Sequence, residues 1–279
     1  MEDVEKKACF FIILFGILRI LLNFAQKLSE KLKKLITILM GVCLSIGAQA
    51  YTIVIDAGHG GKDPGAIGFF SKEKNINLAV AKELGRLIEQ NCPGTKVVYT
   101  RKTDIFVELH ERAQIANRAK ADLFISIHTN STAAGPKGTS SCGTETYTLG
   151  MHRAAENLEV AKRENTVITL ESNFEQKYEG FDPKSSESYI IFELMQDQNM
   201  ASSVGFAKEI QKQFRTTAGR IDRGVHQAGL LVLARTSMPA VLVELGYINN
   251  ANEEKYLNSS AGVAALAKSI YNAFVAYKK

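Results

Sequence analysis

This 279-residue sequence has few prolines, no tryptophan and only a small excess of basic over acidic residues. It has five prolines, no tryptophan and no compositionally biased tract, which argues against a linker-rich or low-complexity protein. Its 34 basic residues nearly balance 29 acidic ones, and residues 51–279 hold 27 and 25. This balance excludes the basic surface that nucleic-acid binding requires. We therefore expect one folded domain and no nucleic-acid partner.

Cysteine is also rare. The four cysteines are Cys9, Cys43, Cys92 and Cys142, and removal of an amino-terminal signal would leave the last two. One disulfide is possible, but nothing in the sequence brings Cys92 and Cys142 together, so two separate thiols are favoured. We assign them no catalytic role. Val42 precedes Cys43 where a lipoprotein signal needs a small residue, so we do not expect lipidation.

Two apolar stretches open the chain, at Ala8–Phe24 and Leu35–Ala50, with a basic segment between them. The second stretch ends in Ala48-Gln49-Ala50 and has the layout of a secretory signal cleaved after Ala50. The first contains Arg19 and, at about 17 residues, is near the lower limit for spanning a bilayer. It is either a membrane anchor or upstream sequence that is not translated. Residues 1–50 are thus predicted to be a signal peptide or a membrane-anchoring leader, and the mature protein periplasmic or extracellular, with membrane contact only if the leader is retained.

From Tyr51 onward, short β-branched runs alternate with amphipathic stretches. The expected strands are Tyr51–Asp56, Lys96–Arg101, Asp122–His128, Thr144–Leu149, Gly229–Leu233 and Ala240–Leu245. The expected helices are Asn75–Gln90, Val107–Ala119 (with Thr103 and Asp104 as cap residues), Phe206–Phe214 and Val263–Ala276. This order predicts a single α/β domain over 51–279, with a mixed, mostly parallel sheet and helices on both faces.

Residues 164–200 interrupt this alternation and form a long insertion. Connections of this length inside a compact domain are usually functional or disordered. The stretch that leads into it, Arg153–Glu164, is predicted to be helical. An apolar run within Glu187–Met195 is expected to pack against another part of the protein.

Polar side chains follow three of the expected strands. His59 and His128 come at or after the ends of two of them, and Glu244 lies near the end of a third. Residues at the carboxyl ends of parallel strands converge although they are far apart in sequence. Glu73 lies just before the helix near Asn75, and so beside the first strand. Two histidines and a glutamate with one open position are a common arrangement for catalytic zinc.

Glu244 stands in an apolar run, where a buried carboxylate is costly unless it has a partner or a task. An exposed strand end is the alternative. Other polar and aromatic residues receive structural interpretations. We expect His110, His152 and His226 to be hydrogen-bonded loop or surface residues, Arg101 and Arg112 to pair at the surface with neighbours such as Asp104 and Glu108, Lys62 to be solvated, and Phe124 and Phe274 to lie in the core.

Taken together, four motifs in this order resemble the zinc-dependent N-acetylmuramoyl-L-alanine amidases of the type-3 catalytic class, which are cell-wall amidases. The motifs are Ile55-Asp56-Ala57-Gly58-His59-Gly60-Gly61 with Asp63-Pro64-Gly65, then Glu73, then Ser126-Ile127-His128-Thr129-Asn130, and Val243-Glu244-Leu245-Gly246-Tyr247-Ile248-Asn249-Asn250. The resemblance covers Tyr51 to Ala276. It implies zinc ligands at His59, Glu73 and His128 and a catalytic glutamate at Glu244.

The resemblance also implies a substrate and a biological role. The expected reaction is hydrolysis of the amide between N-acetylmuramic acid and L-alanine in peptidoglycan, in cell-wall remodelling and daughter-cell separation. Glu244 would act as general base and then as general acid. Two alternatives remain open: a zinc carboxypeptidase-like peptidase, and a wall-binding or partner-binding protein with a vestigial site.

Some relatives carry an insertion whose helix covers the active site until a protein activator withdraws it. Four glutamates in or beside the insertion are candidates for a residue that blocks the zinc: Glu164, Glu171, Glu175 and Glu179. We prefer Glu164, because it follows directly from the helical stretch and precedes apolar residues that can seat on a groove. A substrate-binding flap or a solvated loop is the alternative for this segment.

Overall fold

The computed structural model describes residues 16–21, 51–132, 138–151, 154–194 and 198–278. The chain divides into two units, residues 1–49 and 50–279. Within the first unit, residues 16–21 are helical. None of the helices that the structure describes combines the length and the apolar character needed to cross a membrane. The predicted cleavage site at Ala50 lies outside the described residues.

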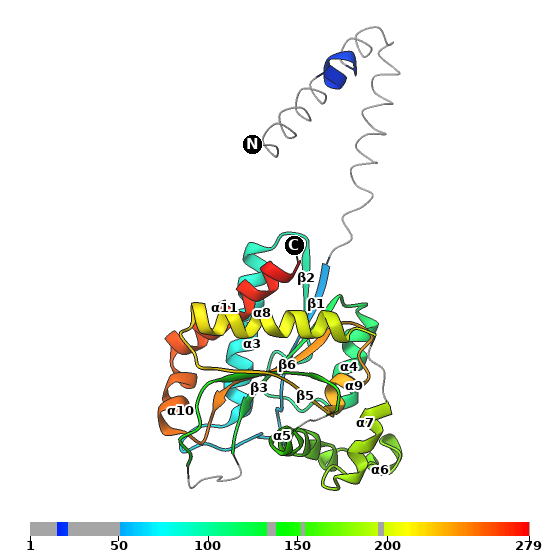
Figure 1. Cartoon of the computed structure of the whole chain (residues 1–279), viewed down its shortest axis with the longest axis vertical. Coiled ribbons are helices and arrows are strands. Elements are labelled where there is room, and N and C mark those ends of the chain that lie inside the picture. The colour runs from blue at the N-terminus through cyan, green and yellow to red at the C-terminus, as the bar shows by residue number, and fades with distance from the viewer. Residues whose placement is uncertain (1–15, 22–50, 133–137, 152–153, 195–197, 279) are drawn as a thin grey trace. The chain divides into compact units, whose positions relative to one another are not determined.

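A six-stranded sheet runs through the described part of the second unit, in the order β2-β1-β3-β6-β4-β5 (Figure 1). The strands are β1 (Tyr51–Ala57), β2 (Thr95–Tyr99), β3 (Leu123–Asn130), β4 (Thr144–Leu149), β5 (Asp222–Ala228) and β6 (Ala240–Tyr247). Strand β4 runs antiparallel to β6, and the other neighbouring pairs are parallel. The predicted mixed, mostly parallel sheet is confirmed.

Three long helices cover one face of the sheet: α3 (Glu73–Asn91), α8 (Met200–Thr217) and α11 (Ser260–Lys278). Alternate strand residues such as Ile53, Ile125 and Val241 are fully buried against them. A period of two along the strands and a 3.6-residue period along the helices bring these apolar side chains together. This core holds the sheet rigid beneath its carboxyl edge.

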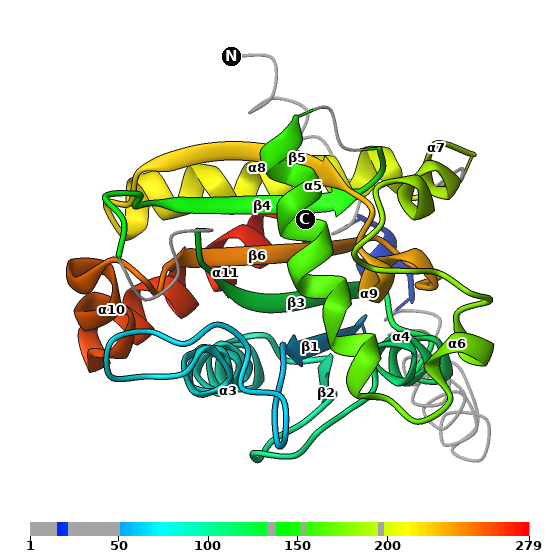
Figure 2. The same cartoon turned by 90° about the horizontal axis from the view of Figure 1, so that it is seen from below.

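The opposite face carries α4 (Leu109–Arg118), α5 (Ala155–Asn165) and α9 (Leu231–Ala234). Val54, Phe124 and Leu242 point to this side and form a second core with residues of these helices. Figure 2 shows α5 lying across the strands. Helices therefore cover both faces, as predicted, and α5 is the one that crosses the sheet where polar side chains follow the strands.

The insertion is built from short helical turns after α5. They are η2 (Thr166–Leu170), α6 (Phe174–Lys177), η3 (Glu187–Ile190) and α7 (Ile191–Leu194). A further helix, α10 (Ala251–Asn258), follows β6. Tyr189 and Phe192 are buried and contact the half-buried Phe181, whereas Ile190 and Ile191 are exposed. The expected helix before the insertion and the expected packing of its apolar run are both confirmed, although half of that run faces solvent.

The predicted strand at Gly229–Leu233 is wrong. The strand in this region, β5, ends at Ala228, and Leu231–Ala234 forms the single helical turn α9. Strand β5 lies at the sheet edge and is mostly half-buried, so its sequence is polar and carries no apolar alternation. The apolar run after it is buried as a turn, because a short apolar run fits a buried turn as well as a strand.

The predicted capping of α4 by Thr103 and Asp104 is also wrong. The helix begins at Leu109 after Glu108. Asp104 instead accepts a hydrogen bond from the Gly61 amide and pairs with Lys74, which fastens the loop that follows β1. Its carboxylate therefore stabilises the loop that follows β1 rather than the end of a helix.

The expected thiols and core aromatics are confirmed. Cys92 and Cys142 are both free, and Phe124 and Phe274 are fully buried.

Candidate metal centre

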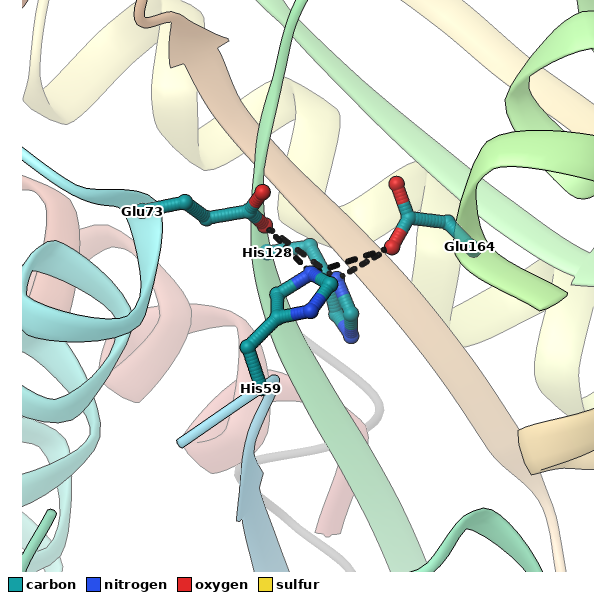
Figure 3. A group of neighbouring side chains, drawn as sticks. All are labelled: His59, Glu73, His128 and Glu164. Atoms are coloured by element: carbon teal, nitrogen blue, oxygen red, sulfur yellow. Dashed lines mark ion pairs between the residues drawn. The ribbon is translucent and has the colours of Figure 1, made fainter. Parts of the chain in front are cut away.

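Four side chains from four different elements meet at the carboxyl edge of the sheet (Figure 3). His59 follows β1, Glu73 is the first residue of α3, His128 lies near the end of β3, and Glu164 comes from the last turn of α5. Each offers one ligand atom, and these atoms all lie within 4.8 Å of one another. The structure thus brings together the three residues predicted as ligands and the glutamate predicted to block them.

The backbone conformation around His59 lets the two histidines approach each other. His59 has a φ of 61°, in the left-handed region that side chains other than glycine rarely adopt. Such conformations persist where the surrounding structure enforces them, and they cluster at functional sites. A Cβ on Gly58 would lie 2.3 Å from Nε2 of His128, so only glycine leaves room for that imidazole.

The distances define a small pocket of ligand atoms. Oε1 of Glu73 lies 3.2 Å from Nε2 of His59 and 3.3 Å from Nδ1 of His128. Oε2 of Glu164 lies 3.3 Å and 2.9 Å from the same two nitrogens. Both nitrogens and Oε2 of Glu164 are buried and lack a well-formed hydrogen bond. Since buried polar atoms are nearly always satisfied, this set fits a site for a divalent cation.

A further layer of contacts orients the ligands. Nδ1 of His59 lies 2.7 Å from Oδ2 of Asp63, which directs Nε2 into the centre. Oε1 of Glu73 accepts hydrogen bonds from the Thr129 amide at 2.9 Å and from Asn77 at 3.1 Å, and Oε2 accepts one from the Ala66 amide. Asp63 and Asn77 were not predicted as orienting residues, although each lies four positions after the ligand that it contacts.

Arg101 and Arg112, predicted to form surface pairs, are both buried, so that prediction is wrong. Arg112 forms an ion pair with the buried Asp56 at 2.7 Å and also donates to the carbonyl of His59. Arg101 donates to the carbonyls of Ala57 and Gly58. Both arginines bind carbonyl groups at the end of β1 and in the turn after it, and in this way they fix the position of His59.

The charges in the centre are strongly coupled. Burial disfavours the imidazolium of His59, but Glu73, Asp63 and Glu164 outweigh it and hold the pKa of His59 well above its usual value. The same competition, with Glu164 as the main carboxylate, raises the pKa of His128 to about 9. The pKa values of Glu73 and Glu164 are lowered, since the histidines outweigh the cost of burial. The carboxylates and the imidazoles therefore stabilise one another's charged forms.

Glu244 is buried, which excludes the exposed strand end considered above. It lies on β6 directly beside His128 in the register of β3 and β6. Nη2 of Arg163 lies 3.3 Å from its Oε1, and its Oε2 has no hydrogen-bond partner in the described residues. Burial, followed by the charge of Glu164, raises the pKa of Glu244 well above its usual value, while Arg163 opposes the rise.

Arg163 is a third residue of the centre that the sequence did not predict. Its Nε lies 2.9 Å from Oε1 of Glu164, and its Nη1 donates to the carbonyl of Ser131 at 2.6 Å. Arg163 and Glu164, neighbours on α5, thus contact both Glu244 and the histidines. Nothing in the spacing of α5 alone marked Arg163, because its two partners lie on separate elements.

The other candidates lie away from this centre. Glu171 accepts hydrogen bonds from the Leu109 amide and Tyr178, and Glu175 and Glu179 are exposed. Nδ1 of His110 lies 3.6 Å from Glu108, and Nε2 of His226 contacts the carbonyl of Arg223, as expected for structural histidines. Lys62 is exposed, and His152 lies outside the described residues.

Glu108, His110 and Glu171 also offer ligand atoms within 4.8 Å of one another. Nζ of Lys177 lies 2.7 Å from Glu108 and 4.0 Å from Glu171. An ammonium group therefore already supplies the positive charge that these carboxylates need.

An α/β sheet with two histidines and buried carboxylates at its carboxyl edge is typical of metal-dependent hydrolases. Residues 53–276 match the family model described as N-acetylmuramoyl-L-alanine amidase. The chain belongs to this amidase family, which confirms the resemblance recognised in the sequence.

Relatives and solved structures agree with this assignment. The chain is 31% identical over 228 residues to N-acetylmuramoyl-L-alanine amidase AmiA of Escherichia coli K12, covering 81% of this chain and 75% of the relative. It is 32% identical to AmiC of E. coli O6:H1, but spans only 52% of that protein. The catalytic domain of CwlV from Bacillus (Paenibacillus) polymyxa superposes with a TM-score of 0.58 at 31% identity, covering 82% of this chain and 98% of that one. An amidase from Clostridium difficile 630 gives 0.61 at 26% identity, with coverage of 82% and 97%.

Proposed function

We propose that this protein is a zinc-dependent hydrolase of the amide bond between N-acetylmuramic acid and L-alanine in peptidoglycan. The observation that carries this proposal is the convergence of Nε2 of His59, Nδ1 of His128 and Oε1 of Glu73 beside the buried Glu244. Family membership supplies the amidase reaction, and the donor set supplies the choice of metal. Two imidazoles and one carboxylate are a donor set that zinc commonly takes in hydrolases.

His59, Glu73 and His128 would hold the zinc. Bound there, zinc supplies polarisation of the scissile carbonyl and acidification of water. Asp63, Asn77 and the Thr129 amide keep the ligand atoms aimed at one point, so little reorganisation is needed when the metal binds.

Glu244 would move the protons. Its carboxylate takes the proton of the attacking water and returns it to the leaving amine, as general base and then general acid. Its place beside His128 on the neighbouring strand supports this role. Its raised pKa supports it as well, because a group that must accept and release a proton near neutral pH benefits from such a shift.

Glu164 would keep the resting enzyme weak. Its Oε2 lies beside both histidine nitrogens, where it would take the position that water needs. Val167 and Ile168, which follow in η2, are buried in the core on the same face of the sheet and so anchor the closed position of α5. A protein activator that withdraws α5 would release both Glu164 and Arg163.

We further propose that the mature chain begins near Tyr51 and acts in the periplasm or outside the cell, in wall remodelling and daughter-cell separation. The signal-like pattern ending at Ala50 supports export. The peptidoglycan substrate implied by the amidase family also lies outside the cytoplasm.

Metal analysis and a peptidoglycan dye-release assay test this function together. Purified residues 51–279 should contain roughly one zinc per chain, as a three-ligand site predicts, and should release dye from labelled peptidoglycan. Removal of the metal by a chelator should abolish release, and zinc should restore it. A chain that neither binds zinc nor releases dye would leave the binding protein with a vestigial site as the better account.

A further inference from the structure

Beyond the metal centre, a row of polar side chains continues across the sheet toward β5. His128 on β3 is paired with Glu244 on β6, and Glu244 is paired with Glu145 on β4. Directly paired residues point to the same face of a sheet, so these three side chains lie side by side. Strand β5 follows β4 in the sheet, and Arg223 is its second residue. The row therefore leads from the proposed site of cleavage to an arginine at the sheet edge.

Glu145 holds this arginine in place. Oε1 of Glu145 accepts from Nε of Arg223 at 2.6 Å and from the Tyr247 hydroxyl at 2.7 Å. Oε2 accepts from the Tyr147 hydroxyl at 2.7 Å and from Asn130 at 3.1 Å. Four donors thus share the charge of one buried carboxylate. Arg223 is the one charged donor among these four, so an ion pair anchors its guanidinium.

Arg223 is fixed at its inner end and open at its outer end. Its side chain is 41% exposed, and its guanidinium carbon lies 5.3 Å from the ring centroid of Tyr247. A guanidinium has five N–H donors in a planar fork, so Nε bound to Glu145 leaves donors available at the exposed end. Planar donors of this kind match the two oxygens of a carboxylate. A side chain held by a buried glutamate and a ring loses little entropy when it binds a ligand.

We propose that Arg223 binds the free α-carboxylate of the second residue of the stem peptide and selects substrates that carry it. This inference rests on the proposed amidase function, because it takes the scissile amide to lie at the metal centre. Neighbouring strands are about 4.8 Å apart, which puts the backbones of β3 and β5 about 14 Å apart across three spacings. Two extended residues span about 7 Å, and the long side chain of arginine covers the remainder. A stem peptide whose second residue is glutamate linked through its γ-carboxyl group presents its α-carboxylate in this range.

Paired substrates and variants test the inference. The two substrates are muramoyl-L-Ala-γ-D-Glu-L-Lys with a free α-carboxylate on the glutamate and the same compound with an α-carboxamide, both amidated at the carboxyl terminus. Arg223→Gln should lower kcat/KM for the free carboxylate by about 10- to 100-fold, chiefly through KM, because the contact is made in both ground and transition states. The carboxamide substrate should change by less than about 3-fold, a difference below one charged contact. Arg223→Lys should recover part of the loss, since it restores the charge without the fork.

Arg215→Gln is the matched control. Arg215 is exposed on α8 and pairs with Asp222, the neighbour of Arg223, but it lies outside the polar row. It should leave both substrates unchanged. Equal losses on the two substrates in Arg223→Gln would mean that the variant damages the Glu145 network rather than carboxylate binding, and would overturn the inference, as would no loss on either. If the unaltered chain hydrolyses neither substrate, the amidase proposal itself fails.

Discussion

Replacing Glu164 with glutamine separates a blocking role of α5 from a purely structural one. The amide keeps the shape of the side chain but removes the charge that faces His59 and His128 at 3.3 Å and 2.9 Å. A buried contact between opposite charges contributes as much as a hydrogen bond to a charged group, about 1.5–3 kcal/mol. The loss of two such contacts is partly offset because the variant no longer buries a charged carboxylate. The net shift is about 1.5–3 kcal/mol toward the state in which α5 has withdrawn from the metal centre. At 1.4 kcal/mol per factor of ten, activity should rise by roughly 10- to 100-fold.

The assay is dye release from labelled peptidoglycan, at equal zinc content, by the unaltered chain, Glu164→Gln and the control Glu159→Gln. Glu159 lies on the same helix, but its side chain is 70% exposed and pairs only with Lys162 among the described residues, so the control should match the unaltered chain. If Glu164→Gln is folded, zinc-loaded and no more active than the unaltered chain, the blocking role is refuted.

Four further changes probe the centre. Glu244→Gln should retain zinc and lose about 10²- to 10⁴-fold in turnover, as expected for a general base; zinc loss measured by metal analysis would instead make Glu244 a ligand. His59→Ala should lose metal and activity together, and retention of full zinc would contradict its assignment. Gly58→Ala should weaken zinc binding in a competition titration, because the new Cβ displaces the His128 ring; unchanged affinity would argue against that contact. In the chain without metal, the pKa of His128 is raised from the usual 6.5 to about 9, so its contribution to stability is full below pH 6.5 and is lost as pH rises through 9. Urea unfolding should show about 3 kcal/mol of this stability lost above pH 9, and His128→Ala should reduce the loss without abolishing it, because the pKa of His59 is raised as well.

The sequence predicted the parts of the fold that follow from local patterns. Buried strands such as β1 and β6 are mostly apolar, and a period of 3.6 marks α3 and α11. Strand β5 was not predicted, because an edge strand buries few side chains and its sequence therefore shows no alternation of apolar and polar residues. The burial of Arg112 was not predicted for a different reason. An arginine in a polar helix normally belongs to the surface, and only the tertiary placement of Asp56 beneath α4 makes it a core residue.

The sequence predicted that the candidate site residues meet at one edge of the sheet. Strand ends at His59, His128 and Glu244 meet because parallel strands share a carboxyl edge. The sequence spacing did not predict that Arg163 and Glu164, in the last turn of α5, both reach the site. Their placement depends on the angle at which α5 crosses the sheet, which long-range packing sets.

Mass spectrometry of the products from purified peptidoglycan tests the central claim most directly. An amidase that cleaves between N-acetylmuramic acid and L-alanine should yield intact stem peptides with a new amino-terminal alanine, together with glycan free of peptide. The Glu244→Gln variant should yield neither product above background. Stem peptides shortened from their carboxyl ends, with the muramoyl amide intact, would identify a peptidase and contradict the account.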